Sequence, residues 1–189
     1  MDEQYRWQQF LEGTQEALSE IFLTHHDDLF RYGLKLTGNQ EMVKDCIQDL
    51  FLKLWKNRSN LKMVQSVKPY LFKSLRNHLT DSLEMQKPNL SLTDETIDYL
   101  NLKYSYEDFV VNDLVSKETR QQVITAINKL SSRQREAIYL RYFQDLDFET
   151  IAQIMEMNVQ SVRNTLQRAM QFMRDLMLLH PFLIMLCKL

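Results

Sequence analysis

Glycine and proline are scarce in this chain, with three of each among 189 residues. All-β folds need many turn residues, so this scarcity favours long helices with few breaks. Two cysteines, Cys46 and Cys187, are too few for a disulfide framework, and the four histidines form no metal-ligand spacing with them. The chain also has no Gly-rich phosphate loop and no nucleophile motif, so we expect no enzymatic activity, no cofactor and no metal.

Net charge is also small, at −2, which excludes a nucleic-acid binder that acts through bulk charge. The charge is uneven along the chain, however. Residues 56–87 hold seven basic side chains against two acids, whereas residues 84–118 hold eight acids against three lysines. Any DNA contact must therefore come from local patches. Because the first residues are polar and lack the apolar stretch of a signal peptide, we expect a cytoplasmic protein.

Apolar residues recur at helical intervals over two parts of the chain. The spacing predicts helices at 5–36, 40–55 and 66–84, then at 116–129, 132–142 and 147–156, with a last helix after Asn158. We therefore predict an all-α fold with two small helical domains. The first, 1–87, is a bundle of three or four helices. A linker, 88–115, joins it to a four-helix domain, 116–176, and an apolar tail, 177–189, follows.

The segment from Leu130 to Ala169 predicts a helix-turn-helix, in which two short helices are separated by three or four residues. Such a motif needs a small residue where its helices cross, and Ala152 occupies that position. It also needs apolar residues at the turn and along the second helix. These positions hold Met157, Val162 and Leu166.

The outward face of that second helix is free of acids. Residues 159–174 contain three arginines and no acidic side chain, which is unusual for an ordinary solvated face. Guanidinium and amide groups are the side chains that read base edges and bind phosphates. We therefore predict a DNA-binding face that consists of Gln160, Ser161, Arg163, Asn164, Gln167, Arg168 and Gln171.

This segment resembles region 4 of the sigma-70 family of transcription initiation factors, particularly its small extracytoplasmic-function (ECF) class. In that class a Leu-(Pro/Ser)-x-x-(Gln/Arg)-Arg stretch, here from Leu130, precedes a helix-turn-helix that ends in an Arg-Ala pair, here Arg168-Ala169. The resemblance implies recognition of the promoter −35 element. One departure is Glu156, where the family usually has glycine. A positive φ there would cost on the order of 1 kcal/mol.

A second resemblance lies in the helix expected at 40–55, where an Asp, a Gln-acid pair, a Phe and a Leu-Trp pair have the spacing of region 2.2. In the family this surface docks on the β′ clamp helices of RNA polymerase. Acid and amide groups beside apolar anchors suit an arginine-rich partner helix. The resemblance implies that polymerase docks on Asp45, Gln48, Asp49, Phe51, Leu54 and Trp55.

The stretch 57–84 resembles regions 2.3 and 2.4, which open and read the −10 element. The family's aromatic-Leu pair appears as Tyr70-Leu71 and its Arg-Asn pair as Arg76-Asn77, but the usual arginine cluster after them is missing. DNA melting needs groups that capture an unstacked base and cations that guide the backbone. An ordinary solvated helix face is the alternative for each residue. The predicted −10 contacts are Asn57, Asn60, Lys62, Lys68, Lys73, Arg76 and Asn77.

The linker 88–115 is acidic but contains several aromatic residues, so we expect it to lie along a surface rather than in solvent. In the family it threads towards the polymerase active-site and RNA-exit channels, where negative charge would mimic nucleic acid. The tail 177–189 is too short to span a bilayer and lacks the basic flank of a surface anchor. We expect it to pack on the protein or a partner, holding the domains together or covering a binding surface.

The resemblance implies a sigma factor that binds core RNA polymerase, through the β′ clamp helices and the β subunit, and directs it to promoter DNA. Members of the ECF class are usually held inactive by an anti-sigma factor, often membrane-bound. A conventional helix-turn-helix regulator remains the alternative, but it leaves the region 57–84 unexplained. A protein-interaction module that acts as an anti-sigma decoy is disfavoured by the acid-free face.

Overall fold

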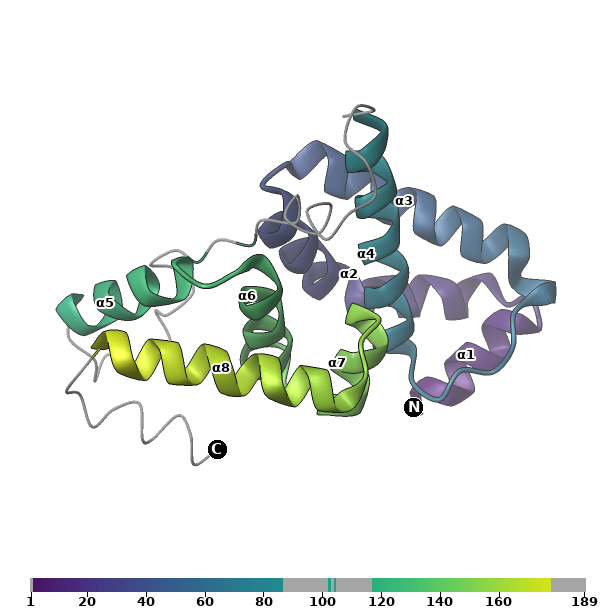
Figure 1. Cartoon of the computed structure of the whole chain (residues 1–189). Coiled ribbons are helices and arrows are strands. Elements are labelled where there is room, and N and C mark those ends of the chain that lie inside the picture. The colour runs from purple at the N-terminus through teal and green to yellow at the C-terminus, as the bar shows by residue number, and fades with distance from the viewer. Residues whose placement is uncertain (1, 87–101, 103, 105–116, 178–189) are drawn as a thin grey trace.

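The computed structural model describes residues 2–86, 102, 104 and 117–177 (Figure 1). All regular structure in these ranges is helical, which confirms the predicted all-α fold. The predicted linker, apart from Leu102 and Tyr104, and the predicted tail from residue 178 lie outside the described residues. The N-terminal helices are α1 (Glu3–Leu11), α2 (Gln15–Thr37), α3 (Gln40–Asn57), the 3-10 helix η1 (Arg58–Asn60) and α4 (Val67–Gln86).

The predicted helical span 5–36 is wrong in one respect, because the chain divides it into α1 and α2. Gly13 has a φ of +100°, and the absence of a Cβ atom lets it turn the chain there. Trp7 of α1 is fully buried, and its Nε1 donates to the Lys62 carbonyl oxygen at 3.2 Å. The first helix therefore anchors the loop that precedes α4.

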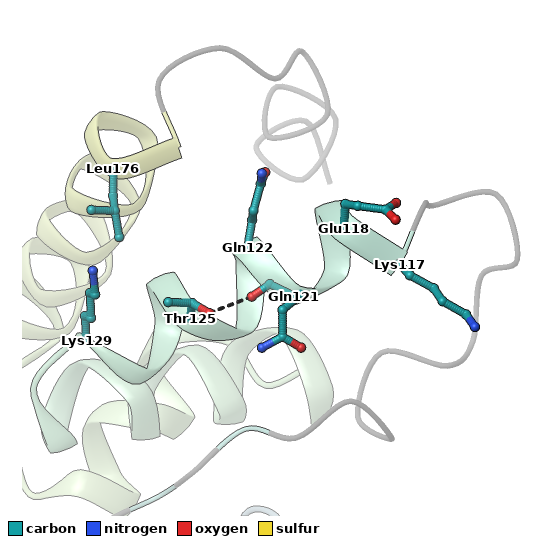
Figure 2. Close-up of a pocket in the computed structure, with 7 residues that line it drawn as sticks. All are labelled: Lys117, Glu118, Gln121, Gln122, Thr125, Lys129 and Leu176. Carbon is teal, nitrogen blue, oxygen red and sulfur yellow. Dashed lines mark hydrogen bonds between the residues drawn. The ribbon is translucent and has the colours of Figure 1, made fainter.

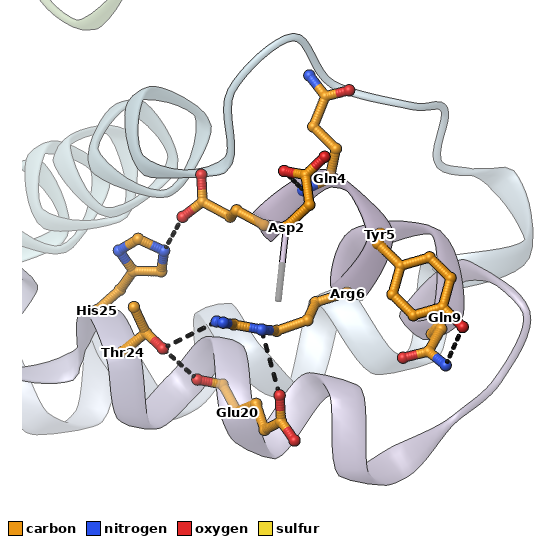
Figure 3. A network of polar contacts seen from close by, with 9 residues as sticks. Asp2, Gln4, Tyr5, Arg6, Gln9, Glu20, Thr24 and His25 are labelled. Atoms are coloured by element: carbon orange, nitrogen blue, oxygen red, sulfur yellow. Dashed lines mark hydrogen bonds and ion pairs between the residues drawn. The ribbon is translucent and has the colours of Figure 1, made fainter.

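Polar contacts also join α1 to α2 (Figure 3). The Arg6 guanidinium forms an ion pair with Glu20 at 3.2 Å. His25, which is buried, contacts the Glu3 carboxylate at 2.7 Å. These contacts fix the angle at which the short first helix lies on the long second one.

The break between the predicted spans 5–36 and 40–55 is confirmed, because α2 ends at Thr37 and α3 begins at Gln40. Gly38 ends α2 in the left-handed conformation, and the Asn39 side chain caps α3 by accepting from the Met42 amide at 3.1 Å. Further along the same pair of helices, a Cβ atom at Gly33 would lie only 2.8 Å from Val43 Cγ1. Glycine at this position therefore allows α2 and α3 to pack closely.

The C-terminal helices are α5 (Lys117–Asn128), α6 (Ser132–Ile138) with a following π turn η4 (Tyr139–Phe143), α7 (Phe148–Met155) and α8 (Val159–Met177). Ser131 forms a capping box with Gln134 at the start of α6, which agrees with the predicted start of this helix at residue 132. Arg135 Nη1 donates to the Asn128 and Leu130 carbonyl oxygens at 3.0 and 2.7 Å, and so satisfies the C-terminal end of α5.

Tyr104 of the predicted linker packs on this domain. Its backbone amide donates to Asn128 Oδ1, and its carbonyl accepts from Asn128 Nδ2, both at 3.0 Å. The Tyr104 hydroxyl donates to the Arg135 carbonyl oxygen at 3.0 Å, and its ring lies 5.3 Å from that of Phe143. The expectation that linker aromatic residues lie along a surface is confirmed for Tyr104.

The helix-turn-helix consists of α7 and α8, with the three residues 156–158 between them. Asn158 caps α8 by accepting from the Ser161 amide at 2.7 Å, as predicted. Ala152, at the predicted crossing, is buried, as are Val162 and Leu166. Glu156 takes the left-handed conformation, with φ at 54° and ψ at 46°. The motif thus forms without glycine at that position, and Glu156 adopts the positive φ for which the sequence predicted a conformational cost.

The two groups of helices contact one another, with α7 against α4 (Figure 1). Tyr32 of α2 is fully buried in this contact, and its ring lies 5.0 Å from Phe72 and 5.9 Å from Tyr139. The periodicity of the sequence did not predict this contact. We call it the closed arrangement.

Candidate nucleic-acid and partner interfaces

The predicted DNA-binding face of α8 lies in solvent. Six of its seven residues are exposed, and only Ser161 is half-buried. The Gln160 amide donates to Asn164 Oδ1 at 2.9 Å, and Gln171 contacts Asp175 at 2.8 Å in the last turns. Val162, Leu166 and Ala169 hold the opposite face in the core. The structure therefore presents the amides and guanidiniums of this face together.

Phe148, at the start of α7, supports this face in a way that sequence reasoning missed. The Arg163 guanidinium lies 5.1 Å from its ring centre, and that of Arg141 lies 5.2 Å from it. Glu149 lies 3.9 Å from Arg163. Cations are attracted to the negative face of an aromatic ring, so Phe148 helps to orient Arg163 before any ligand binds. The only sequence signal was an aromatic residue at the first helical position.

A largely apolar groove lies between α2 and α3. Three of the six residues predicted for polymerase docking, Gln48, Phe51 and Trp55, line its α3 side. Asp45 and Asp49 are exposed on the same helix but are not among its lining residues. The α2 side, which sequence reasoning missed, is lined by Gln15, Leu18, Ser19, Phe22, Leu23 and His26.

Leu54 does not belong to this surface. It is 3% exposed in the core of the N-terminal domain and does not line the groove, so its assignment as a docking residue is corrected here. The helical repeat places it on the inner face of α3, with Leu50, which also does not line the groove. Leu23, at 75% exposure, is instead the apolar side chain that stands most clearly in solvent at the groove. An exposed leucine of this kind marks a contact surface when other apolar residues adjoin it.

The residues predicted to contact the −10 element divide into two groups. Asn57, Asn60 and Lys62, before α4, are exposed. On α4 itself, Lys68 pairs with Asp28 of α2 at 3.1 Å, within the same domain. The loop side chains are thus accessible to a ligand, whereas Lys68 already has an anionic partner.

Lys73 and Arg76 of α4 contact acids of the C-terminal domain. The Lys73 ammonium lies 3.1 Å from the Glu156 carboxylate, and Arg76 Nε donates to Glu136 at 2.8 Å. A hydrogen bond from Lys73 lowers the pKa of Glu156, to which the adjacent Asn77 also contributes. Burial alone would lower the pKa of Arg76, but Glu136 and then Tyr32 raise it. In this arrangement Arg76 is 8% exposed and cannot reach a phosphate.

A further hollow lies between α5 and the end of α8 (Figure 2). Six of its seven lining residues are polar or charged, and none of the residues predicted for DNA or polymerase contact takes part in it. Among the described residues, no three metal-ligating side chains gather at one place, and no helix is both long and apolar enough to cross a membrane. The candidate interfaces are therefore the α8 face, the α2–α3 groove, and α4 with its preceding loop.

Comparison with known proteins agrees with this geometry. Residues 21–88 match the model of sigma-70 region 2, and residues 120–173 match that of sigma-70 region 4. The chain belongs to the sigma-70 family. It is similar to the sigma factor SigV of Bacillus subtilis, with 28% identity over 85% of this chain and 91% of SigV. It is also similar to the ECF sigma factor SigM of that species, with 23% identity over 85% of this chain and 94% of SigM.

Two solved structures have a similar fold. CnrH, solved with the cytosolic domain of CnrY, has a TM-score of 0.62 and 17% identity, and the match covers 93% of this chain and 96% of CnrH. RpoE of Bartonella quintana, solved with the anti-sigma factor NepR, has a TM-score of 0.58 and 21% identity, over 84% of this chain and 95% of RpoE. The chain is thus an ECF-class sigma factor, which directs promoter-specific transcription.

Proposed function

We propose that this sigma factor docks on core RNA polymerase through the α2–α3 groove and reads promoter DNA with both domains. The observation that carries the proposal is the apolar groove on the helix that also bears Asp45 and Asp49. A conventional helix-turn-helix regulator has no need of this surface. Apolar residues at the centre of an interface supply affinity, and charged residues at its rim orient the partner.

The groove suits the β′ clamp helices, which the family resemblance names as the partner. Phe22, Phe51 and Trp55 supply the aromatic anchors, and Leu23 adds exposed apolar area. Asp45 and Asp49 carry the negative charge that would meet basic residues of the clamp. The β subunit is the second expected contact.

The C-terminal domain is proposed to fix the −35 element in a major groove through α8. A face with guanidinium and amide groups and no acid between residues 159 and 170 suits phosphates and base edges alike. The N-terminal domain is proposed to act at the −10 element through the exposed Asn57, Asn60 and Lys62, together with Lys68, Lys73, Arg76 and Asn77 of α4.

An anti-sigma factor is a further proposed partner, since the similar sigma factor RpoE was solved in complex with the anti-sigma factor NepR. A membrane-bound anti-sigma factor would agree with what the resemblance to the ECF class implies. The sigma factor itself is proposed to act in the cytoplasm, where RNA polymerase is found. No chemical step is needed for this activity, because promoter opening draws on binding energy.

Capture of bacterial core RNA polymerase tests the docking proposal. Wild type should retain the core enzyme, and Asp45→Lys combined with Asp49→Lys should lose most of it. The charge-matched control is Glu12→Lys combined with Glu118→Lys, two exposed acids outside the groove. If neither wild type nor control captures the core while both bind duplex DNA, the helix-turn-helix regulator becomes the better account.

A further inference from the structure

A single carboxylate of the C-terminal domain accepts hydrogen bonds from two helices of the N-terminal domain. Glu136 of α6 is only 1% exposed. Its Oε1 accepts from the Tyr32 hydroxyl at 2.6 Å and from Arg76 Nε at 2.8 Å, while Oε2 lies 3.5 Å from Arg76 Nη2. Burial first and then the Glu136 carboxylate raise the pKa of Tyr32, so its hydroxyl remains a donor. The contact thus joins α2, α4 and α6.

A second acid pairs with the same helix one turn away. The Glu156 carboxylate lies 3.1 Å from the Lys73 ammonium, and residues 73 and 76 lie on one face of α4 because they are three positions apart. Glu156 holds a left-handed conformation that glycine would adopt without strain. A glycine there could not reach Lys73. The acid at this strained position therefore has an observable use in the contact between the domains.

Aromatic packing accompanies the two ion pairs. Tyr32 lies between Phe72 of its own domain and Tyr139 of the other, at centroid distances of 5.0 and 5.9 Å, with the rings nearly parallel. The contacts of Tyr32 with Glu136 of α6 and Tyr139 of η4 would be lost if the C-terminal domain moved away from α2 and α4. The arrangement is thus a packed interface rather than a single surface ion pair.

We propose that Glu136 and Glu156 occupy on α4 the places that DNA phosphates would take, so that the free chain keeps its own −10 surface closed. The inference rests on the proposed function of α4. Carboxylate and phosphate are the two anions that arginine binds with the same fork geometry. The attraction within a buried ion pair is partly offset by the cost of desolvating its two charges. A partner that binds the separated domains can therefore open the Arg76–Glu136 contact. Polymerase and promoter would supply such partners.

Reversal of charge at the buried pair tests the closure directly. Small-angle X-ray scattering of the full chain, without DNA or polymerase, should give a larger radius of gyration for Glu136→Arg and for Arg76→Glu. The double variant, which restores opposite charges, should return to the wild-type radius. Glu118→Arg, on α5 and away from α4, should leave the radius unchanged. Single variants with the wild-type radius, or a double variant that stays expanded, would overturn the proposal.

Because a buried reversal can impair folding, the same exchange at the exposed pair serves as the second test. Lys73 and Glu156 side chains are 44% and 54% exposed, so Lys73→Glu and Glu156→Lys disturb no buried group. Each should expand the chain by less than the changes at Glu136, and the double exchange should restore it. Helical content by circular dichroism should remain that of wild type throughout. Expansion in neither single variant would count against the closure.

Binding of a fluorescent oligodeoxythymidylate shows whether the acids compete with DNA. Glu136→Gln and Glu156→Gln keep side-chain size but remove charge, and together they should raise affinity severalfold. Glu118→Gln should not. Unchanged affinity in an expanded variant would refute the phosphate-mimic part of the proposal. If the proposed sigma function is wrong, wild type will fail to capture core polymerase. If only the proposed closure is wrong, wild type will still capture core polymerase, but the charge reversals will leave the radius of gyration unchanged.

Discussion

On α8 the side chains predicted to read DNA lie in solvent, whereas on α4 Lys73 and Arg76 are bonded to carboxylates of the other domain. Both helices carry a basic face, and both are amphipathic. The difference lies in what opposes them. On the α8 face, Arg163 meets Phe148 and the exposed Glu149 of its own domain, while the α4 face meets Glu136 and Glu156 of the other domain.

This difference indicates a sequence of events at a promoter. In the proposed account, the exposed α8 face can bind duplex DNA in the free chain, whereas Lys73 and Arg76 of α4 become available only in the fraction of molecules whose domains have separated. Apparent affinity falls in proportion to that fraction. A core enzyme that binds the separated form would raise it, and melting would then follow docking. The predictions below test each side of this contrast.

The largest effect is expected on DNA binding by the exposed face of α8. Arg163→Ala and Arg168→Ala should each weaken binding of a −35 duplex by about 1–3 kcal/mol, if each guanidinium makes a bidentate guanine contact. Footprinting with the reconstituted holoenzyme measures this. Gln153→Ala, an exposed residue of α7 outside the face, is the control. An unchanged footprint in the arginine variants would refute the assignment of α8 as the recognition helix.

Gly33→Ala should destabilise the N-terminal domain by about 1–3 kcal/mol through overpacking, since its Cβ would lie 2.8 Å from Val43 Cγ1 and 3.1 Å from Cγ2. This loss should exceed the gain of roughly 1 kcal/mol in helix propensity. Denaturant unfolding measures it. In a Val43→Ala background the same change should become neutral or stabilising, which is a double-mutant test of the contact. Equal losses in both backgrounds would contradict the explanation.

Glu156→Gly should act in opposite directions on the two sides. It should stabilise the C-terminal domain by about 1 kcal/mol by removing left-handed strain, and it should weaken the contact with α4 by removing the partner of Lys73. Glu156→Gln keeps the strain and removes the charge. Thermal unfolding and scattering of the two variants separate the effects. A glycine variant no more stable than the glutamine variant would exclude strain at this residue.

Asp147→Ala should cost about 1 kcal/mol through loss of the α7 cap, since Asp147 accepts from the Thr150 amide at 2.7 Å. That hydrogen bond lowers the pKa of Asp147, so its contribution is fully present above the ordinary pKa and is lost as pH falls through the lowered value. Asp147→Asn should keep a cap but lose this acid dependence. The free energy of unfolding is measured against pH for wild type and both variants. Parallel curves in acid would contradict the assignment of Asp147 as the cap.

Local features of the fold were predictable from sequence because they rest on neighbouring residues. The break near Gly38 and the starts of α6 at Ser132 and of α8 after Asn158 all follow from short-range chemistry. The outward face of α8 followed from helical periodicity. The break at Gly13 was missed because the apolar repeat continues across it. Leu54 was assigned to docking from the family resemblance, although the structure buries it in the core.

The closed arrangement was beyond sequence reasoning for a different reason. Glu136 lies 104 residues from Tyr32 and 60 from Arg76, and no periodic pattern relates them. Glu136 read as an ordinary acid in an amphipathic helix. Glu156 was recognised as a departure from the family's glycine, but its pairing with Lys73 required the tertiary structure. Burial of a charged side chain can be predicted only when the helix that covers it is known.

One distance measurement tests the contrast between open and closed faces most directly. Spin labels at Ser59→Cys and Gln153→Cys, in a chain without Cys46 and Cys187, report the separation of the two domains. We predict a single short distance in the free sigma factor and a longer one with core RNA polymerase. The same distance distribution in both states, or a long distance already in the free chain, would contradict the account.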